Sequence, residues 1–282
     1  MITGKSYEER QKINGLSSER ADIIIAGALV IQEILRKAKA SYLTISGCGL
    51  REGLFFHYYD PIYDKNAEKQ HDMLRCSVQN YLDTLPITYD FHTKYVTVTA
   101  LAMFDQWQKV HKLDPRMRDI LAAAARLHDI GNLINYYSHA RHSCYMTANA
   151  HIFGWTHSEQ VMCALICAFH HGYSGKYLKA NGQAHILTAA QMRQVRILSL
   201  FLAMAEGLNE SQEHCITRVI CTSYKAAMDL RVYTDRENFD VPAHATAPLV
   251  KDFEKTFHLP FRIQWFPGSS HRNELVEAAQ KL

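Results

Sequence analysis

The feature that most constrains the fold is a long central stretch, residues 66–209, in which apolar residues recur at helical spacing. Capping boxes open two of its segments, at Thr156-x-x-Glu159 and Thr188-x-x-Gln191. Such a stretch can bury its apolar faces only by packing helix on helix. We therefore expect a loop at residues 172–183 and helices at 67–84, 89–111, 115–128, 137–150, 157–170 and 188–208.

The two ends of the chain have a different pattern, typical of small α/β pieces. The N-terminal piece, residues 1–60, is expected to hold a helix at 17–38, capped by Ser17, and a strand at 42–46. Residues 61–212 would form the helical domain, and residues 213–282 a C-terminal subdomain. In this last part the pattern predicts strands at 216–222, 228–233 and 261–266 and a helix at 247–257.

Composition excludes several classes of protein. Apolar residues make up 48% of the chain and charged residues 21%, as in globular proteins, and the net charge of +3 gives no specific nucleic-acid signal. The longest apolar runs, such as Val161–Phe169, are too short to span a bilayer, and the N-terminus has no export signal. Seven scattered cysteines indicate reduced thiols. We therefore expect a cytoplasmic protein without membrane contact.

Two histidines and a glutamate lie on the apolar stripes of three predicted helices. His92, His128 and Glu206 each follow apolar residues at spacings of three and four, and Asp129 adjoins His128. Taken singly, each has an ordinary interpretation as a hydrogen-bonded core residue or a solvated edge. A buried carboxylate, however, is costly unless it is paired or coordinates a metal. Two imidazoles and two carboxylates together would suit a divalent cation.

The run Arg126-Leu127-His128-Asp129-Ile130-Gly131 resembles the signature of the HD superfamily of metal-dependent phosphohydrolases. This resemblance implies metal ligands at His92, at the His128-Asp129 doublet and on a later helix. At that last position the superfamily has aspartate, whereas this chain has Glu206, whose longer arm moves the carboxylate.

Further histidines follow in an order that resembles the HD-GYP branch, in which extra histidines hold a second metal. This resemblance implies additional ligands at His142 and His170, and His171 is left out. The alternative for His139 and His142 is an exposed helix start. The alternative for His170 is a helix C-terminus, where histidine suits the helix dipole without any ligand role.

A closer resemblance extends over most of the chain. Residues 15–27 (GLSSERADIIIAG), 49–54 (GLREGL) and 203–211 (AMAEGLNES) are similar to segments of the exopolyphosphatase / guanosine pentaphosphate phosphohydrolase family, as is His139-x-x-His142-Ser143. The family carries phosphate loops in two actin-like lobes, but neither Asp-x-Gly-Ser nor Gly-Gly-Gly-Ser occurs here. The expected fold class is mainly α: an HD-type helical domain with small α/β extensions at both ends, without those catalytic lobes.

The function implied is metal-dependent hydrolysis of a phosphate ester or anhydride, on a nucleotide or polyphosphate-like substrate. Asp129 and His128 would be catalytic, and the divalent ion could be Mn, Mg, Fe or Zn. Phosphate groups of the substrate would be neutralised by Arg126, Arg141 and Lys176. The resemblance also favours a homodimer. The alternative is a non-catalytic regulatory or dimerisation module retained from the family.

Three aromatic residues near the histidines leave a choice open. Tyr136, Tyr137 and Trp155 could stack on a nucleobase, or they could be core aromatics.

Overall fold

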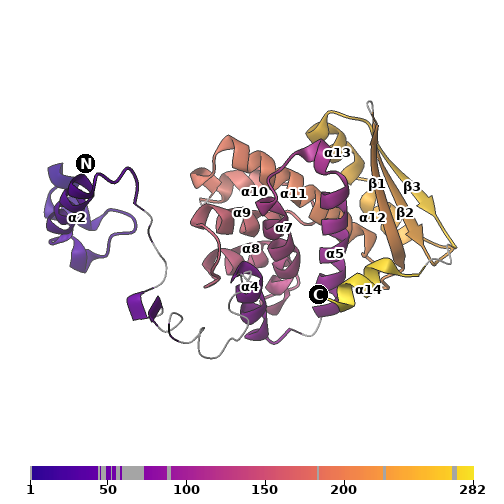
Figure 1. The fold of residues 1–282 in the computed structure, drawn as a ribbon, viewed down its shortest axis with the longest axis horizontal. Coiled ribbons are helices and arrows are strands. Elements are labelled where there is room, and N and C mark those ends of the chain that lie inside the picture. Colours follow the sequence, from indigo (N-terminus) through magenta and orange to yellow (C-terminus); the bar gives the residue numbers. More distant parts are fainter. Residues whose placement is uncertain are drawn as a thin grey trace. The chain divides into compact units, whose positions relative to one another are not determined.

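The structure is a computed structural model of the chain. It describes residues 2–43, 45, 49–51, 53–54, 58, 73–87, 90–182, 184–224, 227–268 and 272–282. The chain divides into two compact units, Met1–Gln70 and His71–Leu282, which are described separately (Figure 1). The domain boundaries expected at residues 60 and 212 stay a prediction.

In its described part, the first unit contains two short 3-10 helices, η1 (Ile2–Gly4) and η2 (Ser18–Arg20), and the α-helices α1 (Tyr7–Gln11) and α2 (Ile24–Ala38). The expectation that one helix starts at Ser17 is wrong. Ser17 precedes η2 without a side-chain capping bond, and the α-helix begins only at Ile24. Of the expected strand at 42–46, the described residues Tyr42, Leu43 and Ile45 are not in a strand, and residues 44 and 46 lie outside the described part.

The second unit contains the helical domain, and its helices confirm the periodic pattern. Both predicted capping boxes form, with the hydroxyl of Thr156 accepting the backbone N–H of Glu159 and that of Thr188 accepting the N–H of Gln191. The expectation of a plain loop at 172–183 is wrong, because Ser174 caps a short helix there. The helices are α4 (Met73–Asp83), α5 (Asp90–Gln106), α6 (Gln108–His111), α7 (Arg116–Leu127), η3 (Ile130–Leu133), α8 (His139–Asn149), α9 (His157–Ala168), α10 (Gly175–Ala180), η4 (Ala184–Ile186) and α11 (Ala189–Leu208).

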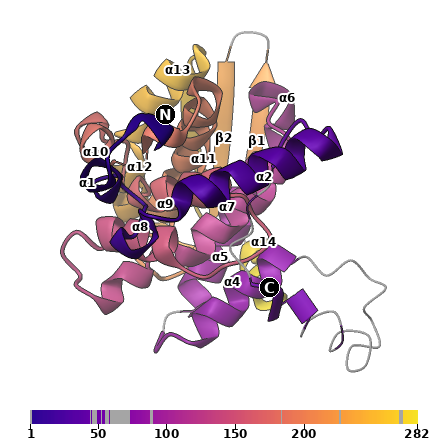
Figure 2. The ribbon, with the colours of Figure 1, turned by 90° about the vertical axis from the view of Figure 1, so that its left-hand side faces the viewer.

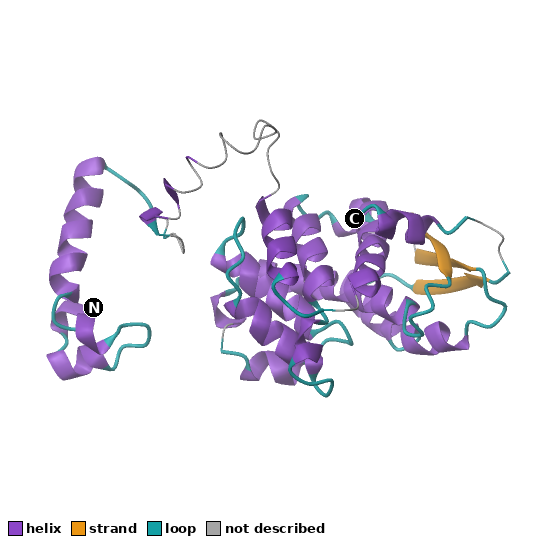
Figure 3. Cartoon of the chain, turned by 90° about the horizontal axis from the view of Figure 1, so that it is seen from below, coloured by secondary structure: helices purple, strands orange, loops and turns teal. Residues whose placement is uncertain are grey.

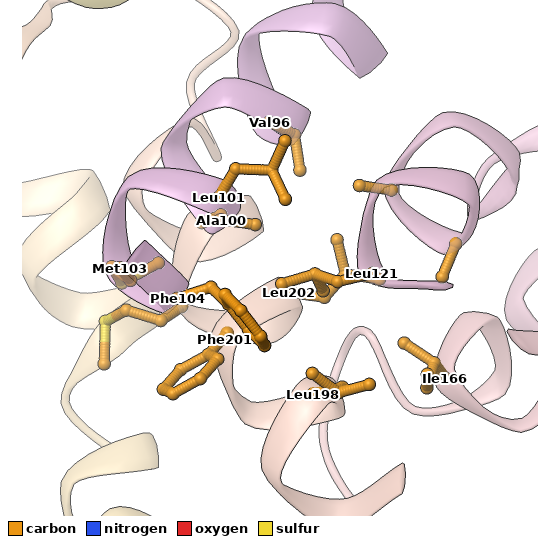
Figure 4. Close-up of a cluster of buried hydrophobic side chains, with 14 of the residues drawn as sticks. Val96, Ala100, Leu101, Met103, Phe104, Leu121, Ile166, Leu198, Phe201 and Leu202 are labelled. Atoms are coloured by element: carbon orange, nitrogen blue, oxygen red, sulfur yellow. The ribbon is translucent and has the colours of Figure 1, made fainter. Parts of the chain in front are cut away.

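The hydrophobic core lies where α5, α7, α9 and α11 pack against one another. Figure 4 shows Val96 of α5, Leu121 of α7, Ile166 of α9 and Leu202 of α11 pointing into this core. Nearly every side chain in the second half of α11 is buried, so this helix is surrounded by the others. The polar residue Glu206 is carried into the interior by that burial.

A small sheet completes the second unit, at one end of the helical bundle (orange in Figure 3). Strand β1 (Ile216–Tyr224) pairs antiparallel with β2 (Ala227–Thr234), which pairs parallel with β3 (Phe261–Phe266). Figure 2 shows β1 and β2 side by side. The connection from β2 to β3 runs through α12 (Asp240–Thr246) and α13 (Leu249–Phe257), and α14 (Glu274–Gln280) packs on α5 and β1.

The sheet is joined to the helical domain by hydrogen bonds as well as by packing. The hydroxyl of buried Tyr95, in α5, donates to the carbonyl of Ile216, and the indole N–H of Trp107 donates to the carbonyl of Thr222 over 3.2 Å. The observed fold is mainly α with a small sheet, which confirms the predicted fold class. Among the described residues, none of the helices has the length and apolar character needed to cross a membrane.

Candidate metal centre

The four residues that the sequence singles out come together in the interior of the second unit. His92 lies in the first turn of α5, His128 and Asp129 follow α7, and Glu206 lies near the end of α11. The Oε2 atom of Glu206 is 3.2 Å from the Nε2 atoms of both His92 and His128. Asp129 Oδ2 is 3.6 Å from His92 Nε2. Helical spacing explains this convergence, since each side chain continues an apolar stripe that faces the same core.

Charge is concentrated in this small volume, although almost no water reaches it. His128 is fully buried, and Glu206 is only 8% exposed. Burial by itself raises the pKa of Glu206, but hydrogen bonding to His128 and His92 holds it well below its usual range. Burial lowers the pKa of His128, but the carboxylates of Asp129 and Glu206 raise it to about 10. The two carboxylates therefore favour positive charge at this place, from a proton or from a metal cation.

A second group of histidines adjoins the first. His139 is the first residue of α8, and His170 and His171 directly follow the end of α9. The Nε2 atom of His139 lies 3.0 Å from that of His170 and 3.1 Å from that of His171. Asp129 Oδ1 is 3.4 Å from His139 Nε2 and 3.8 Å from His170 Nε2. Asp129 therefore lies between the two groups.

Backbone carbonyl groups orient three of these imidazoles. In each ring the Nδ1 atom lies within hydrogen-bond distance of the carbonyl oxygen three residues upstream, so Nδ1–H donates, and in the neutral form of the ring Nε2 carries a lone pair. In metal-binding histidines, a hydrogen bond from the ring nitrogen that does not bind the metal fixes the tautomer. The pairs are His128 with Ala125 at 2.8 Å, His139 with Tyr136 at 2.9 Å and His170 with Cys167 at 2.6 Å.

One feature of these atoms fits a bound cation. With Nδ1 as the donor, the neutral rings of His139 and His170 have no hydrogen to place between their Nε2 atoms, so in that form two lone pairs face each other across 3.0 Å. Burial and the rings of His128 and His171 hold the pKa of His170 well below its usual value, which disfavours a shared proton. A divalent cation would satisfy these nitrogen atoms.

The described residues thus contain three groups whose ligand atoms lie within 4.8 Å of one another and could hold a metal ion. Their donor sets of imidazole nitrogen and carboxylate oxygen suit several divalent metals and do not select one. The groups are His92, His128 and Glu206; His128, Asp129 and His170; and His139, His170 and His171.

The other residues predicted for the site lie elsewhere or at its margin. His142 is half-buried on α8 and belongs to none of these groups. Arg126 is buried, and its guanidinium donates to Thr93 Oγ1 at 2.9 Å while lining a cavity of about 300 Å³. Arg141 is exposed, with its guanidinium 5.4 Å from the ring centre of Tyr177, and Lys176 is exposed on α10. The roles of these four residues stay predictions.

Two members of the cluster, His139 and His171, are absent from the predicted ligand set. The signal for His139 was present in the His-x-x-His sequence, but the choice between its two histidines depends on where the helix begins. Because α8 starts at His139, this residue faces Asp129, and His142 lies almost one turn further along. His171 is included because the helix before it ends at Ala168, which leaves both neighbouring histidines free to turn toward His139.

Comparison with known proteins gives the family. The profile described as Ppx/GppA phosphatase, domain III, matches residues 75–251, and the profile of the Ppx/GppA phosphatase family matches residues 1–62. The chain belongs to the Ppx/GppA phosphatase family. The family resemblance identified from the sequence motifs is thereby confirmed, whereas membership of the HD superfamily stays a prediction.

Two relatives are named guanosine-5'-triphosphate,3'-diphosphate pyrophosphatase. The protein of Aeromonas salmonicida is 26% identical over 246 residues, which cover 81% of this chain and 48% of the relative. That of Photobacterium profundum is 25% identical over 209 residues, covering 71% of this chain and 38% of the relative. The matched region thus spans about half of these relatives or less.

Proposed function

We propose that this Ppx/GppA family chain is a metal-dependent phosphohydrolase that acts on a phosphate ester or anhydride of the nucleotide or polyphosphate type. The observation that carries the proposal is the convergence of imidazole Nε2 atoms and two carboxylates in a nearly dry interior. The names of the relatives, which describe a pyrophosphatase of a guanosine nucleotide, agree with this class of substrate.

We assign the metal ligands to two groups of residues, one on each side of Asp129. His92, His128 and Glu206 would bind one cation, and His139, His170 and His171 offer a second position. A divalent cation at such a site lowers the pKa of bound water and stabilises the charge on a phosphoryl group. Mn, Mg, Fe and Zn all remain candidates, because nitrogen and oxygen donors together suit each of them to some degree.

The chain's own residues supply orientation and exclude bulk water. The carbonyl groups that accept from Nδ1 hold the rings in place, so few degrees of freedom remain to be fixed when a ligand binds. We assign to Asp129 the orientation of the attacking water, because its carboxylate faces both groups and can accept a hydrogen bond from that water. Arg141 and Lys176, both exposed, would contact the substrate's phosphates.

The test is elemental analysis of protein purified without chelator and then dialysed against Mn²⁺. We expect about one equivalent of metal or more in the wild type, a clear loss in His128→Ala, and phosphate release from nucleotide or tripolyphosphate that is lost in the same variant. His151→Ala is the matched control, since His151 is exposed and lies outside the cluster.

Because His128 is fully buried, its removal could also unfold the protein. Glu206→Gln therefore serves as a second variant, which keeps the side-chain shape and removes the charge. A folded wild type that binds no metal, or metal retained in both folded variants, would contradict the proposal and favour the alternative of a non-catalytic regulatory or dimerisation module. The predicted homodimer is a separate question that solution mass measurements can answer.

A further inference from the structure

The cluster has a buried side and an open side. His128 and His170 are at most 1% exposed, whereas His171 is an exposed residue. The more accessible side of the cluster is therefore that of the second group, where His139 and His171 lie, and we take it as the side from which a substrate approaches. Whatever part of the substrate is not undergoing reaction must remain against the surface next to these two residues.

Two tyrosines occupy that surface, immediately before α8. Tyr136 and Tyr137 are 75% and 80% exposed, so they are not core aromatics. The ring centre of Tyr136 lies 5.9 Å from that of His139, with an angle of 34° between the planes. The ring of Tyr137 packs edge-on against Tyr136, at 5.8 Å between ring centres. An exposed pair of aromatic rings therefore borders a metal-binding imidazole.

The turn that carries the two tyrosines is fixed by hydrogen bonds. The side chain of Asn135 accepts the backbone N–H of Tyr137 at 2.8 Å, and the carbonyl of Tyr136 accepts from His139 Nδ1 at 2.9 Å. The second bond ties the position of Tyr136 to the ring that faces Asp129. Trp155, by contrast, is half-buried, so it offers less free ring surface to a ligand.

We propose that Tyr136 and Tyr137 form a stacking platform for a nucleobase, so that the substrate is a nucleotide and not inorganic polyphosphate. This inference rests on the proposed function, because the platform selects a substrate only if the adjoining cluster binds phosphate groups. Aromatic side chains bind bases through their faces, with little dependence on the base. A bare phosphate chain has no flat apolar group that would gain from these rings.

The experiment compares two ligands that carry the same chain of three phosphates, GTP and inorganic tripolyphosphate. Their Kd values are measured by calorimetry at low temperature with the Mn²⁺-loaded protein, in the wild type, Tyr136→Ala and Tyr137→Ala. We expect GTP to bind more tightly than tripolyphosphate to the wild type. Each substitution should weaken GTP binding by about 5- to 100-fold and leave tripolyphosphate binding unchanged. Tyr136→Phe should retain the affinity for GTP.

Tyr145→Ala is the control, because Tyr145 is also an exposed tyrosine, at 67%, and it has no ring contact with the cluster among the described residues. Equal binding of GTP and tripolyphosphate, or a GTP affinity that both tyrosine substitutions leave unchanged, would overturn the platform and leave the proposed function standing. Failure of both ligands to bind the metal-loaded wild type would overturn the proposed function, and the platform with it. Since both tyrosines are exposed, neither substitution removes a core residue.

Discussion

Gly131, which follows the His128-Asp129 doublet, connects the sequence motif to the second histidine group. It is buried in η3, and its N–H donates to Ser143 Oγ at 2.8 Å. A methyl group at this position would overlap the backbone oxygen of His139 and the backbone nitrogen of Ser143, and it would lie 2.8 Å from His142 Cβ. Two of these atoms belong to the backbone, so no rotamer change can relieve the overlap.

The Gly131→Ala substitution should therefore displace the first turn of α8. Normal C···O contacts require about 3.3 Å, so the backbone of His139 has to move by about 1 Å. Overpacking of this kind costs about 1–3 kcal/mol, and we expect the upper end because the obstacles are rigid. For a unit of this size, about 3 kcal/mol corresponds to a fall in Tm of about 6–12 °C. The same shift removes His139 Nε2 from its place, since metal–nitrogen bonds tolerate only a few tenths of an ångström.

Thermal unfolding and elemental analysis test the two consequences together. Gly175→Ala is the matched control, because a methyl group there meets nothing within 4 Å and alanine favours the short helix α10. We expect the control to melt at or slightly above the wild-type temperature with unchanged metal content. A Gly131→Ala protein that melts within about 1 °C of the wild type, with wild-type metal content, would refute the reasoning.

Three further predictions concern stability. Burial raises the pKa of Glu159, but hydrogen bonds from Arg116 and the capping contacts outweigh burial, so the pKa is lowered. The stabilisation that results is present above the ordinary carboxyl range, and it is lost as pH falls through the lowered pKa. The free energy of unfolding of Glu159→Gln, measured in urea, should therefore approach that of the wild type between pH 7 and pH 3; a constant difference would contradict this. Tyr95→Phe deprives the buried Ile216 carbonyl of a donor and should cost about 1–2 kcal/mol in the same assay. Thr188→Ala removes the N-cap of α11 and should cost about 1 kcal/mol, and no loss would show the cap to be dispensable.

The elements that could be predicted are those with a local cause. The box at Thr156 predicted the start of α9 because a hydroxyl and a carboxylate at that spacing satisfy two free backbone donors. The strands predicted at 228–233 and 261–266 match β2 and β3 within one residue at each end, and apolar and polar residues alternate along both. The start of α2 was missed for the opposite reason: Ser17 is a good capping residue, but it precedes a 3-10 turn, and nothing local moves the α-helix to Ile24.

The candidate site likewise contains residues whose positions have a local cause and residues whose positions depend on tertiary packing. His92, His128 and Glu206 could be brought together from sequence because helical geometry sets the direction of each side chain. His139 and His171 lie at helix ends, where a shift of one residue turns a side chain by about 100°. Whether such a residue faces Asp129 or solvent depends on the tertiary packing of α8 and α9, which periodicity does not encode. Local pattern therefore predicts the buried half of the site and leaves its open half undetermined.

Glu206 shows how the two kinds of information combine. From sequence, its extra methylene in place of the expected aspartate cast doubt on the site, because it moves the carboxylate. In the structure this longer arm brings one oxygen, Oε2, within 3.2 Å of both His92 and His128, which lie on different helices. An aspartate at this position, about 1.5 Å shorter, would reach the same nitrogens only if α11 moved closer, and the fully buried Leu202 one turn earlier resists that movement. The glutamate is therefore matched to the spacing of the helices around it, so its longer arm is not an argument against the proposed metal site.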